Sequence, residues 1–340
     1  MAGAGRYFHV HTPLFTMRAN AGRSKGGAFG DSVEELDDSV GRIVAALAAH
    51  SFEENTLIFW TSDNGPYQEE GWESSGRTNI WSNDGRLLGR MKGGKGQIWE
   101  GGIRMPAAVV WPRYVRAGAV SSTFVSTLDI AATVIDVANV TLDVGYAIDG
   151  RSMLPLLLER THVSQHDVFF HYCGFNLLAA RVWGRWKVFW ATQRWYTHQP
   201  LNASVCVQCC NGINPVSKLF GTPASELCGC AGNAIEQLAQ PLVYDMLNDP
   251  IEASALTEQN WPNGTNTTFS AVVQTATDAK VKMDRELHPK PDALGAGTCT
   301  AGLPSHSRQP CCPGCHQAPL KSYCQDTHGA KCSCNRLTSY

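Results

Sequence analysis

One glycine-rich segment of the chain reads Gly93-Gly94-Lys95-Gly96-Gln97-Ile98-Trp99-Glu100-Gly101-Gly102-Ile103-Arg104-Met105-Pro106. Its glycines remove side-chain bulk on both sides of Lys95, so the backbone can approach an anion closely while the ammonium supplies a compact cation. No Gly-x-x-x-x-Gly-Lys-Ser/Thr pattern fits the segment, which excludes a nucleotide-binding P-loop. A lysine between glycines is more often part of a solvated loop, so the segment alone indicates an anion site only weakly.

The apolar runs on either side of this segment predict strands of an α/β fold. Residues 107–111 follow it, and residues 56–61 precede it with β-branched and aromatic side chains that do not alternate with polar ones. Such a run is typical of a strand that is covered on both faces. Residues 31–49 predict an amphipathic helix with Asp31 as N-cap, Glu34 in a capping box and a buried apolar face. A helix followed by a buried strand indicates a parallel sheet.

Two oxygen-bearing side chains follow the first of these strands, in Thr61-Ser62-Asp63-Asn64-Gly65-Pro66. At the carboxyl end of a parallel strand, Asp63 and Asn64 would face the crevice where α/β proteins bind their ligands. They are therefore candidate ligands of Ca²⁺, with Mg²⁺ as an alternative. The tetrapeptide Asp-Asn-Gly-Pro is also strong turn chemistry in any protein, and taken alone it favours a simple turn.

Two histidines near the N-terminus lie in His9-Val10-His11-Thr12-Pro13-Leu14-Phe15. Their alternation places both imidazoles on one side of an extended segment, and Pro13 fixes the turn that follows. Either histidine could bind a metal or donate a proton. A lone His-x-His pair is more often just exposed.

The second half of the chain predicts a different architecture. Residues 127–137 form a candidate helix with Asp129 in its first turn. Beyond residue 155, short strand candidates follow one another mostly without helices, and Gly184-Arg185 offers a hairpin turn, which indicates an antiparallel sheet. We expect an α/β part over residues 1–160, an antiparallel subdomain over 161–290 and a cysteine-rich tail over 291–340. The strand candidates are residues 168–172, 178–182, 187–190 and 242–246.

The composition of the 340 residues narrows the class of protein. Apolar residues make up 43% of the chain, enough for a large core, and the net charge is −2 with only 17% charged residues. A balance so near zero gives no field for binding nucleic acid, although basic and aromatic residues interleave between Arg181 and Trp190. A hairpin explains that pattern better. No apolar run approaches the roughly 20 residues of a transmembrane helix.

The cysteines divide the chain, because all 13 lie between Cys173 and Cys334. A zinc cluster could use the spacings of five of these cysteines, Cys206, Cys209, Cys210, Cys228 and Cys230. Disulfides are the better interpretation of these cysteines if the protein is secretory. Four glycosylation sequons support a secretory protein, at Asn139, Asn202, Asn263 and Asn266. The N-terminus, by contrast, lacks the apolar stretch of a signal peptide.

Three histidines lie around the start of a strand candidate. We interpret them, His162, His166 and His171, as surface residues.

Taken together, these segments resemble the sulfatase family, most closely its arylsulfatase A and N-acetylgalactosamine-6-sulfatase branch. The resemblance covers most of the chain in a fixed order. It includes His11-Thr12-Pro13-Leu14-Phe15, Phe29-Gly30-Asp31-Ser32, Asp63-Asn64-Gly65-Pro66, Lys95-Gly96, Glu100-Gly101-Gly102-Ile103-Arg104-Met105-Pro106, Ile148-Asp149-Gly150-Arg151-Ser152 and Leu242-Val243-Tyr244-Asp245 through Asp249-Pro250. It implies an alkaline-phosphatase-like α/β fold with a C-terminal antiparallel subdomain.

The resemblance also implies roles for individual residues. Lys95 corresponds to the lysine that binds the sulfate group, and His11 to the histidine near the scissile ester oxygen, so both are catalytic and substrate-binding candidates. Asp63 and Asn64 correspond to half of the family's Ca²⁺ site. Fixed cations suit an anionic sulfate, and a departing alkoxide needs a proton or charge stabilisation. Glu100 and Arg104 are expected to support the loop.

The chain departs from the family pattern at the nucleophile. Sulfatases use a formylglycine made from the cysteine of Cys-x-Pro-x-Arg, or from serine in bacteria, and the 340 residues contain no such pentapeptide. Cys312-Pro313-Gly314-Cys315 lacks the arginine. The family's first aspartate pair also belongs upstream of Met1, so we expect a sulfatase that lacks its N-terminal strands and is inactive as this chain alone.

Two functions follow as alternatives. The first is a sulfuric ester hydrolase, arylsulfatase-like, that acts on sulfate esters of aryl or carbohydrate substrates. The second is a non-catalytic secreted protein that binds sulfated glycans on the same scaffold. Either would be lysosomal or secreted, with a sulfated small molecule or glycan as partner, without a nucleic-acid partner or a transmembrane segment. The sequence is compatible with either a monomer or a homo-oligomer.

Overall fold

A computed structural model describes residues 5, 7–11, 14–66, 79–81, 87–141, 148–194, 230 and 232–287. The chain divides into two compact units, Met1–Val281 and Lys282–Tyr340. Every element described below lies in the first unit, except that the last helix ends in the second. Asn202, the cysteines at 206, 209, 210 and 228, and the expected tail over 291–340 lie outside the described residues.

The first helix, α1 (Gly27–Ala49), begins four residues before its predicted start. Asp31 is therefore not the N-cap. It lies within the helix, and its carboxylate accepts hydrogen bonds from the backbone N–H groups of Ser24 and Gly22, both at 2.7 Å, which lower its pKa. The carboxylate thus closes the loop that precedes the helix rather than the helix end itself.

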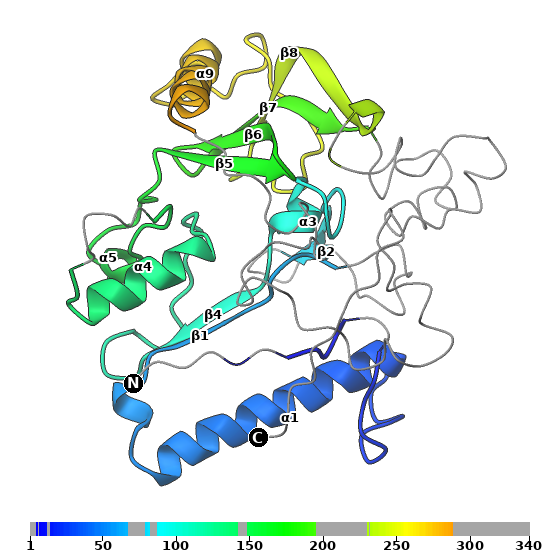
Figure 1. Ribbon diagram of the computed structural model, residues 1–340, viewed down its shortest axis with the longest axis vertical. Helices are drawn as coiled ribbons and strands as arrows, with labels where there is room; N and C mark the ends of the chain where they lie inside the picture. The colour runs from blue at the N-terminus through cyan, green and yellow to red at the C-terminus, as the bar shows by residue number, and fades with distance from the viewer. Residues whose placement is uncertain are drawn as a thin grey trace, which may run out of the picture. The chain divides into compact units, whose positions relative to one another are not determined.

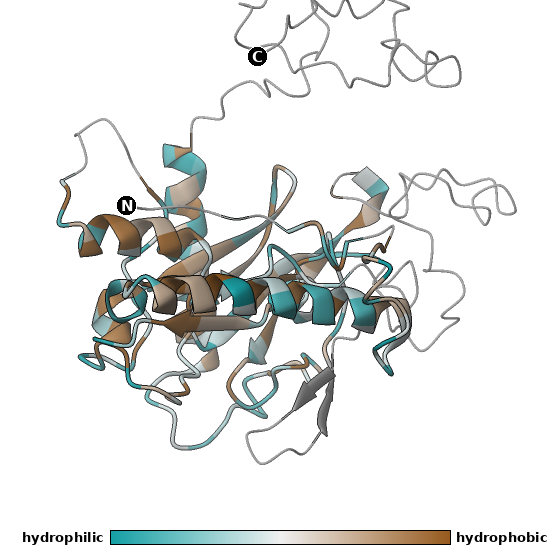
Figure 2. Ribbon diagram, turned by 90° about the horizontal axis from the view of Figure 1, so that it is seen from below, coloured by the Kyte–Doolittle hydropathy of each residue, from teal (hydrophilic) through white to brown (hydrophobic). Residues whose placement is uncertain are grey.

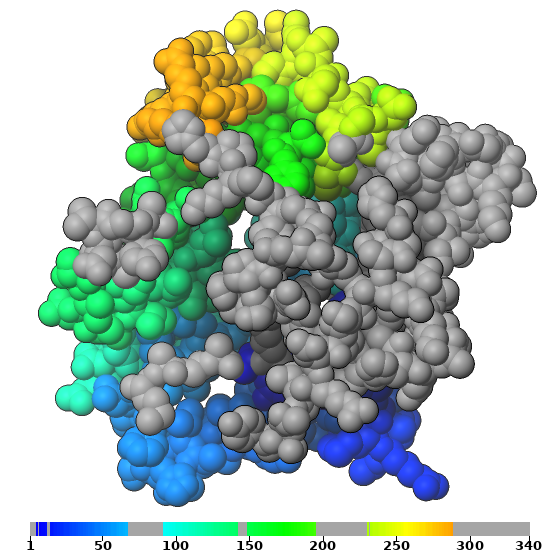
Figure 3. Space-filling view, viewed as in Figure 1, coloured from blue at the N-terminus to red at the C-terminus, as the bar shows by residue number. Residues whose placement is uncertain are grey.

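The predicted buried face of α1 is also wrong. Val33, Ile43 and Val44 are 40%, 50% and 47% exposed. Figure 2 shows apolar residues gathered in the C-terminal half of α1, and Figure 3 shows the helix, in blue, at the surface. Among the described residues, only Asp31 and Ser32 of this helix are buried.

A two-stranded sheet joins the two strands that flank the glycine-rich segment. β1 (Ile58–Thr61) pairs with β4 (Ala107–Val110) in antiparallel register, with Ile58 opposite Val110. The predicted parallel pairing is wrong for this pair, and so is the predicted burial, since Trp60 is 40% and Val110 is 49% exposed. An uninterrupted apolar sequence cannot by itself specify the direction of the partner strand or what covers it. A short 3-10 turn, η1 (Glu53–Asn55), precedes β1, and the hairpin of β2 (Asn79–Trp81) and β3 (Leu87–Arg90) lies between β1 and β4 in sequence.

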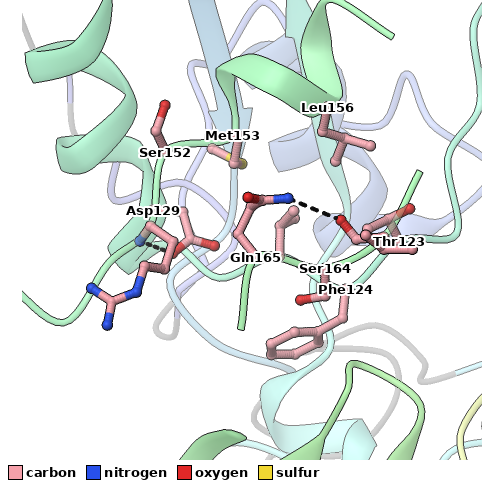
Figure 4. A pocket seen from close by; sticks show the side chains of 11 residues that line it. Thr123, Phe124, Asp129, Ser152, Met153, Leu156, Ser164 and Gln165 are labelled. Carbon is pink, nitrogen blue, oxygen red and sulfur yellow. Dashed lines mark hydrogen bonds between the residues drawn. The ribbon is translucent and has the colours of Figure 1, made fainter. Parts of the chain in front are cut away.

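The predicted helix over 127–137 is confirmed as α4 (Leu128–Val137), and a single turn, α5 (Leu154–Leu157), follows it. Asp129 is buried at the start of α4 and accepts hydrogen bonds from the N–H groups of Ser126 and Arg151 and from His166 Nε2, each at 2.8 Å. His166 is therefore buried, not a surface residue as expected. The cluster ties α4 to the chain before the next sheet, beside a small pocket (Figure 4).

A four-stranded antiparallel sheet confirms the predicted second architecture (Figure 1). Three residues, 183–185, connect the second strand to the third, because Val182 lies opposite Trp186, and this connection contains the predicted Gly184-Arg185 turn. Trp183 and Gly184 have φ angles of 47° and 68°. Arg185 N–H donates to Val182 O at 3.1 Å and closes the connection. The strands, in the order in which they pair, are β5 (Val168–Cys173), β6 (Asn176–Val182), β7 (Trp186–Gln193) and β8 (Ile235–Asp245), the last preceded by η4 (Gly232–Ala234).

One face of this sheet packs against α9 (Phe269–Glu286), a helix that the sequence reasoning missed. Val272 and Ala276 are fully buried there against Val188 and its neighbours on β6, β7 and β8, and Trp261 stacks on Trp186 with ring centroids 4.3 Å apart. The helical spacing of Phe269, Val272, Val273 and Ala276 was the available signal.

The opposite face packs against the glycine-rich segment, which forms the short helix α3 (Glu100–Ile103) and the turns before it. Ile98 and Trp99 are buried there, and the Trp99 ring lies 4.6 Å from that of Phe189. A disulfide joins Cys173 at the end of β5 to Cys230. The sheet thus has a core on each face, and one of them is built around the segment that carries Lys95. No helix among the described residues is long and apolar enough to cross a membrane.

Candidate functional site

His11 and Lys95 lie together, although 84 residues separate them in sequence. Lys95 Nζ is 3.0 Å from His11 Nε2. With the lysine charged, the ammonium donates and the imidazole nitrogen accepts, so the His11 proton is on Nδ1. The contact is exposed, which leaves both groups within reach of a ligand from solvent. The fold thus assembles the predicted cation and the predicted proton carrier in one place.

The Asp-Asn-Gly-Pro turn packs directly on the lysine loop. Gly65 N–H donates to Gly102 O at 2.8 Å, and Lys95 N–H donates to Pro66 O at 2.9 Å. A Cβ atom on Gly65 would lie 1.9 Å from Gly101 O, so this approach requires glycine. The three segments singled out in the sequence therefore lie together.

Asp63 and Asn64 are suited to a metal as donors but do not complete a site. Asp63 is exposed, and Asn64 donates from Nδ2 to Gly65 O at 2.9 Å, which leaves its carbonyl oxygen to accept or to ligate. Two hard oxygens fit Ca²⁺ or Mg²⁺, but Ca²⁺ takes six to eight. No group of three His, Cys, Asp or Glu side chains gathers within the part of the chain that the structure describes. The two residues can thus supply only a share of a coordination shell.

The lysine loop is closed by its own backbone. Gly101 N–H donates to Lys92 O at 2.7 Å, and Gln97 N–H to Gly94 O at 3.1 Å, while the Gln97 side chain accepts from Gly94 N–H. Gly93 has φ of 72° and Gly96 of 83°, conformations that side chains other than glycine rarely adopt. The glycines are required by this fold of the loop and do not simply make it flexible.

A buried cluster of charges lies beneath the loop, and we call it the Lys187 cluster (Lys187, Arg181, Glu100 and Glu252). Lys187 is fully buried on β7. Its ammonium donates to Glu252 Oε1 at 2.8 Å, to Glu100 Oε1 at 3.0 Å and to the backbone oxygen of Ile98 at 2.8 Å. Arg181 Nη1 donates to Glu100 Oε1 at 3.4 Å. The expected supporting role of Glu100 agrees with this position; Arg104 reaches only its other oxygen, at 3.9 Å.

The pKa values of the two carboxyl groups in this cluster diverge. Burial alone would raise the pKa of Glu100, but Lys187 and Arg181 outweigh it and lower that pKa to about 2. Burial raises the pKa of Glu252, and the neighbouring Glu100 charge adds to the effect against the attraction of Lys187. Two carboxylates that share one ammonium behave in this way.

His171 lies near the cluster and is buried, which corrects its interpretation as a surface residue. Burial, with the repulsion of Lys187, holds its pKa well below the usual value, so His171 is neutral at physiological pH. A run of short strands gives no sign of which polar side chains turn inward. The sequence reasoning missed Lys187 and the burial of Arg181 for the same reason. It missed Glu252, which follows the sheet, because its contacts with Lys187 and Glu100 are distant in sequence.

The two histidines of the N-terminal segment have different surroundings. His9 Nε2 is 3.2 Å from Glu35 on α1, and the same carboxylate accepts from Thr16 and, at 2.7 Å, from Met17 N–H. These donors, Thr16 first, lower the pKa of Glu35 to about 2. His9 therefore anchors the segment to α1, and His11 is the histidine that meets Lys95.

Comparison with protein families identifies three matching models. One described as Sulfatase matches residues 12–140, and one described as the C-terminal region of aryl-sulfatase matches residues 164–326. The C-terminal model of N-sulphoglucosamine sulphohydrolase matches residues 94–212. The lysine loop and Glu100 lie in the match to the Sulfatase model. The other three residues of the Lys187 cluster lie in the match to the C-terminal region of aryl-sulfatase.

Curated relatives are similar at about one-third identity. Steryl-sulfatase from Homo sapiens is 35% identical over 291 residues, which are 84% of this chain and 45% of that protein. Arylsulfatase H from Homo sapiens is 34% identical, over 90% of this chain and 49% of that protein. N-acetylgalactosamine-6-sulfatase from Sus scrofa is 37% identical over 55% of this chain and 34% of that protein. The chain spans about half the length, or less, of these relatives.

Solved structures show the same fold. The PsFucS1 sulfatase from Pseudoalteromonas sp. superposes with a TM-score of 0.60 at 24% identity, over 82% of this chain and 48% of that one. A glycosaminoglycan-metabolism sulfatase of Bacteroides thetaiotaomicron gives 0.52 at 21% identity, over the same shares. The predicted alkaline-phosphatase-like fold class is confirmed.

Proposed function

Because this chain belongs to the sulfatase family, we propose that it carries the sulfate-binding part of a sulfuric ester hydrolase site, arylsulfatase-like in its chemistry. One observation supports the proposal above the others: Lys95 Nζ lies 3.0 Å from His11 Nε2 on a loop that is bonded to the Asp-Asn-Gly-Pro turn. A fixed cation beside a proton carrier is what the cleavage of a sulfate ester requires.

The two side chains divide the work. The Lys95 ammonium binds the sulfate oxygens and neutralises their charge, and the Nδ1–H group of His11 donates a hydrogen bond that stabilises the charge on the departing alkoxide. The substrates are sulfate esters of aryl or carbohydrate alcohols. This breadth agrees with relatives that are named for aryl, steryl and N-acetylgalactosamine sulfates.

Asp63 and Asn64 take part as oxygen ligands of Ca²⁺, or of Mg²⁺ in its place. A bound divalent cation would add positive charge beside the sulfate, and the hydrogen bond from Asn64 Nδ2 to Gly65 O holds that side chain in position. The two residues supply two of the six to eight oxygens that Ca²⁺ takes, so other ligands must complete the shell.

The protein is proposed to work in an oxidising compartment, lysosomal or secreted. The Cys173–Cys230 disulfide supports this, because disulfides persist there and are rare in the cytosol. We assign residues 1–160 to the catalytic part and 161–290 to the antiparallel subdomain.

Lys95→Ala is expected to weaken the binding of 4-nitrophenyl sulfate to the 340-residue chain by about tenfold or more. The variant removes the cation that faces the sulfate, and the loss of one charge-assisted contact is worth at least a factor of that size. Isothermal titration calorimetry measures the affinity, with the exposed Lys25→Ala as the matched control. Equal affinities of Lys95→Ala and the unchanged chain would contradict the proposal.

Release of 4-nitrophenol tests whether this chain hydrolyses the ester that it binds. The 340 residues contain no Cys-x-Pro-x-Arg, so we propose that this chain by itself binds the aryl sulfate without hydrolysing it. Turnover by the purified chain that Lys95→Ala abolishes would show that a different nucleophile serves the site.

A further inference from the structure

Gln193, at the end of β7, reaches across to the lysine loop. Its Nε2 donates to Gly96 O at 2.9 Å, and its Oε1 accepts from Ile98 N–H at 3.1 Å. One amide side chain thus holds two backbone groups of the loop. One of them belongs to the residue that directly follows Lys95.

Its surroundings make this contact rigid. Gln193 is 5% exposed and lies opposite Ile235 of β8, at the end of a strand whose first half also pairs with β6. Lys187, six residues earlier on the same strand, binds Ile98 O, and Glu252 Oε2 accepts from Glu100 N–H at 2.8 Å. Three buried side chains therefore bond the loop backbone from Gly96 to Glu100.

Of these three, Gln193 acts closest to Lys95. The bonds from Lys187 and Glu252 hold residues 98 to 100, where α3 begins, whereas the Gln193 bonds bracket the turn on which the lysine stands. Gly96 has φ of 83° and no atom within 4 Å of where a Cβ would lie, so packing against that position does not hold the turn. The directional hydrogen bond from Gln193 to Gly96 O adds to the backbone bond from Gln97 N–H to Gly94 O in holding this turn.

We propose that Gln193 is a positioning residue for Lys95: by holding Gly96 O and Ile98 N–H, it sets where the ammonium stands relative to His11. The inference rests on the proposed function for its ligand, since the affinity that Gln193 tunes is that for a sulfate ester. It assigns the C-terminal sheet a part in the site that it does not touch directly. A rigid supporting group of this kind pre-organises a binding residue.

Gln193→Met tests the proposal, because methionine keeps the length of the side chain and its apolar body but makes neither hydrogen bond. Thr192→Val is the matched control. Thr192 is the preceding residue of β7 and is 8% exposed, and valine has nearly the same shape as threonine. Two quantities are measured on the full chain, the affinity for 4-nitrophenyl sulfate and the hydrogen exchange of the Ile98 amide.

In Gln193→Met we expect Ile98 to exchange at least tenfold faster and the aryl sulfate to bind about three- to tenfold more weakly, while Thr192→Val changes neither. An unchanged Ile98 exchange rate overturns the proposal, and so does faster exchange with unchanged affinity. If the unchanged chain binds no aryl sulfate, the proposed function falls, and the Ile98 amide still decides whether Gln193 holds the loop.

Gln193→Glu keeps the inference testable if the methionine variant does not fold. Its carboxylate can still accept from Ile98 N–H but has no donor for Gly96 O, so the Ile98 amide should stay protected while the affinity falls. Loss of protection at Ile98 in this variant, with the affinity unchanged, would contradict the assigned role of the Gly96 bond.

Discussion

Lys187→Met is expected to lower the free energy of unfolding by about 3–5 kcal/mol, the usual cost of removing one partner from a buried ion pair. Lys187 is fully buried and donates to Glu100, Glu252 and Ile98 O. Its loss leaves two carboxyl groups in the core with Arg181 as the remaining cation of the cluster, 3.4 Å from Glu100. For a domain of this size the melting temperature should fall by about 10 °C.

The pH dependence of this loss of stability shows whether it comes from the missing charge of Lys187 or from the changed packing around it. The Glu100 pKa is about 2 in the folded chain and 4.5 in the unfolded one, so its ionic stabilisation is complete above pH 4.5 and is lost as the pH falls toward 2. The stability difference between Lys187→Met and the unchanged chain should therefore narrow over that interval. Thermal unfolding at several pH values measures it, with Lys25→Met as the exposed control. A gap of the same size at pH 3 and pH 7 would show that lost packing, not lost charge, is responsible.

Gly102→Ala is expected to abolish aryl sulfate binding to the chain and to cost about 3 kcal/mol of stability, at the upper end of what overpacking costs. A Cβ at this position would lie 2.1 Å from Gln97 O and 2.3 Å from Gly94 O. Both atoms are backbone on either side of Lys95, so neither can turn aside as a side chain would. The loop must open, and Lys95 must leave His11.

Gly41→Ala is the matched control for this substitution. Gly41 lies inside α1, and no atom stands within 4 Å of where its Cβ would be. Alanine there should stabilise the chain by about 0.5–1 kcal/mol through its helix propensity and leave ligand affinity unchanged. The account of the loop is wrong if Gly102→Ala binds 4-nitrophenyl sulfate as tightly as Gly41→Ala does.

Local sequence predicted the elements whose periodicity is strong. The strand candidates over 168–172, 178–182, 187–190 and 242–246 correspond to β5 through β8, and α4 lies where its pattern predicted it. The partner of β1 could not be predicted, because the apolar run of 56–61 specifies a strand but neither its direction nor what covers it. α1 was misplaced at its start because Asp31, a strong capping residue, bonds to the loop before the helix instead.

In the candidate site, too, some residues could be predicted from the sequence and others could not. Lys95, His11, Asp63 and Asn64 were identified from the family resemblance, and their segments do lie together. Gln193 and Glu252 could not be found in this way, since their contacts span 95 and 152 residues and depend on the register of β7. A lysine inside an apolar strand is a weak signal, because a strand at the surface would carry it equally well.

We propose that His11 and Lys95 form one sulfate-binding site, and the His11 imidazole reports on that site directly. Its ring resonances are followed by NMR while inorganic sulfate is added to the 340-residue chain, with the exposed His50 as an internal reference. We predict that the His11 resonances shift and saturate, that His50 stays unchanged, and that Lys95→Ala removes the His11 response. His11 resonances that stay constant, or that shift equally in Lys95→Ala, would contradict the claim.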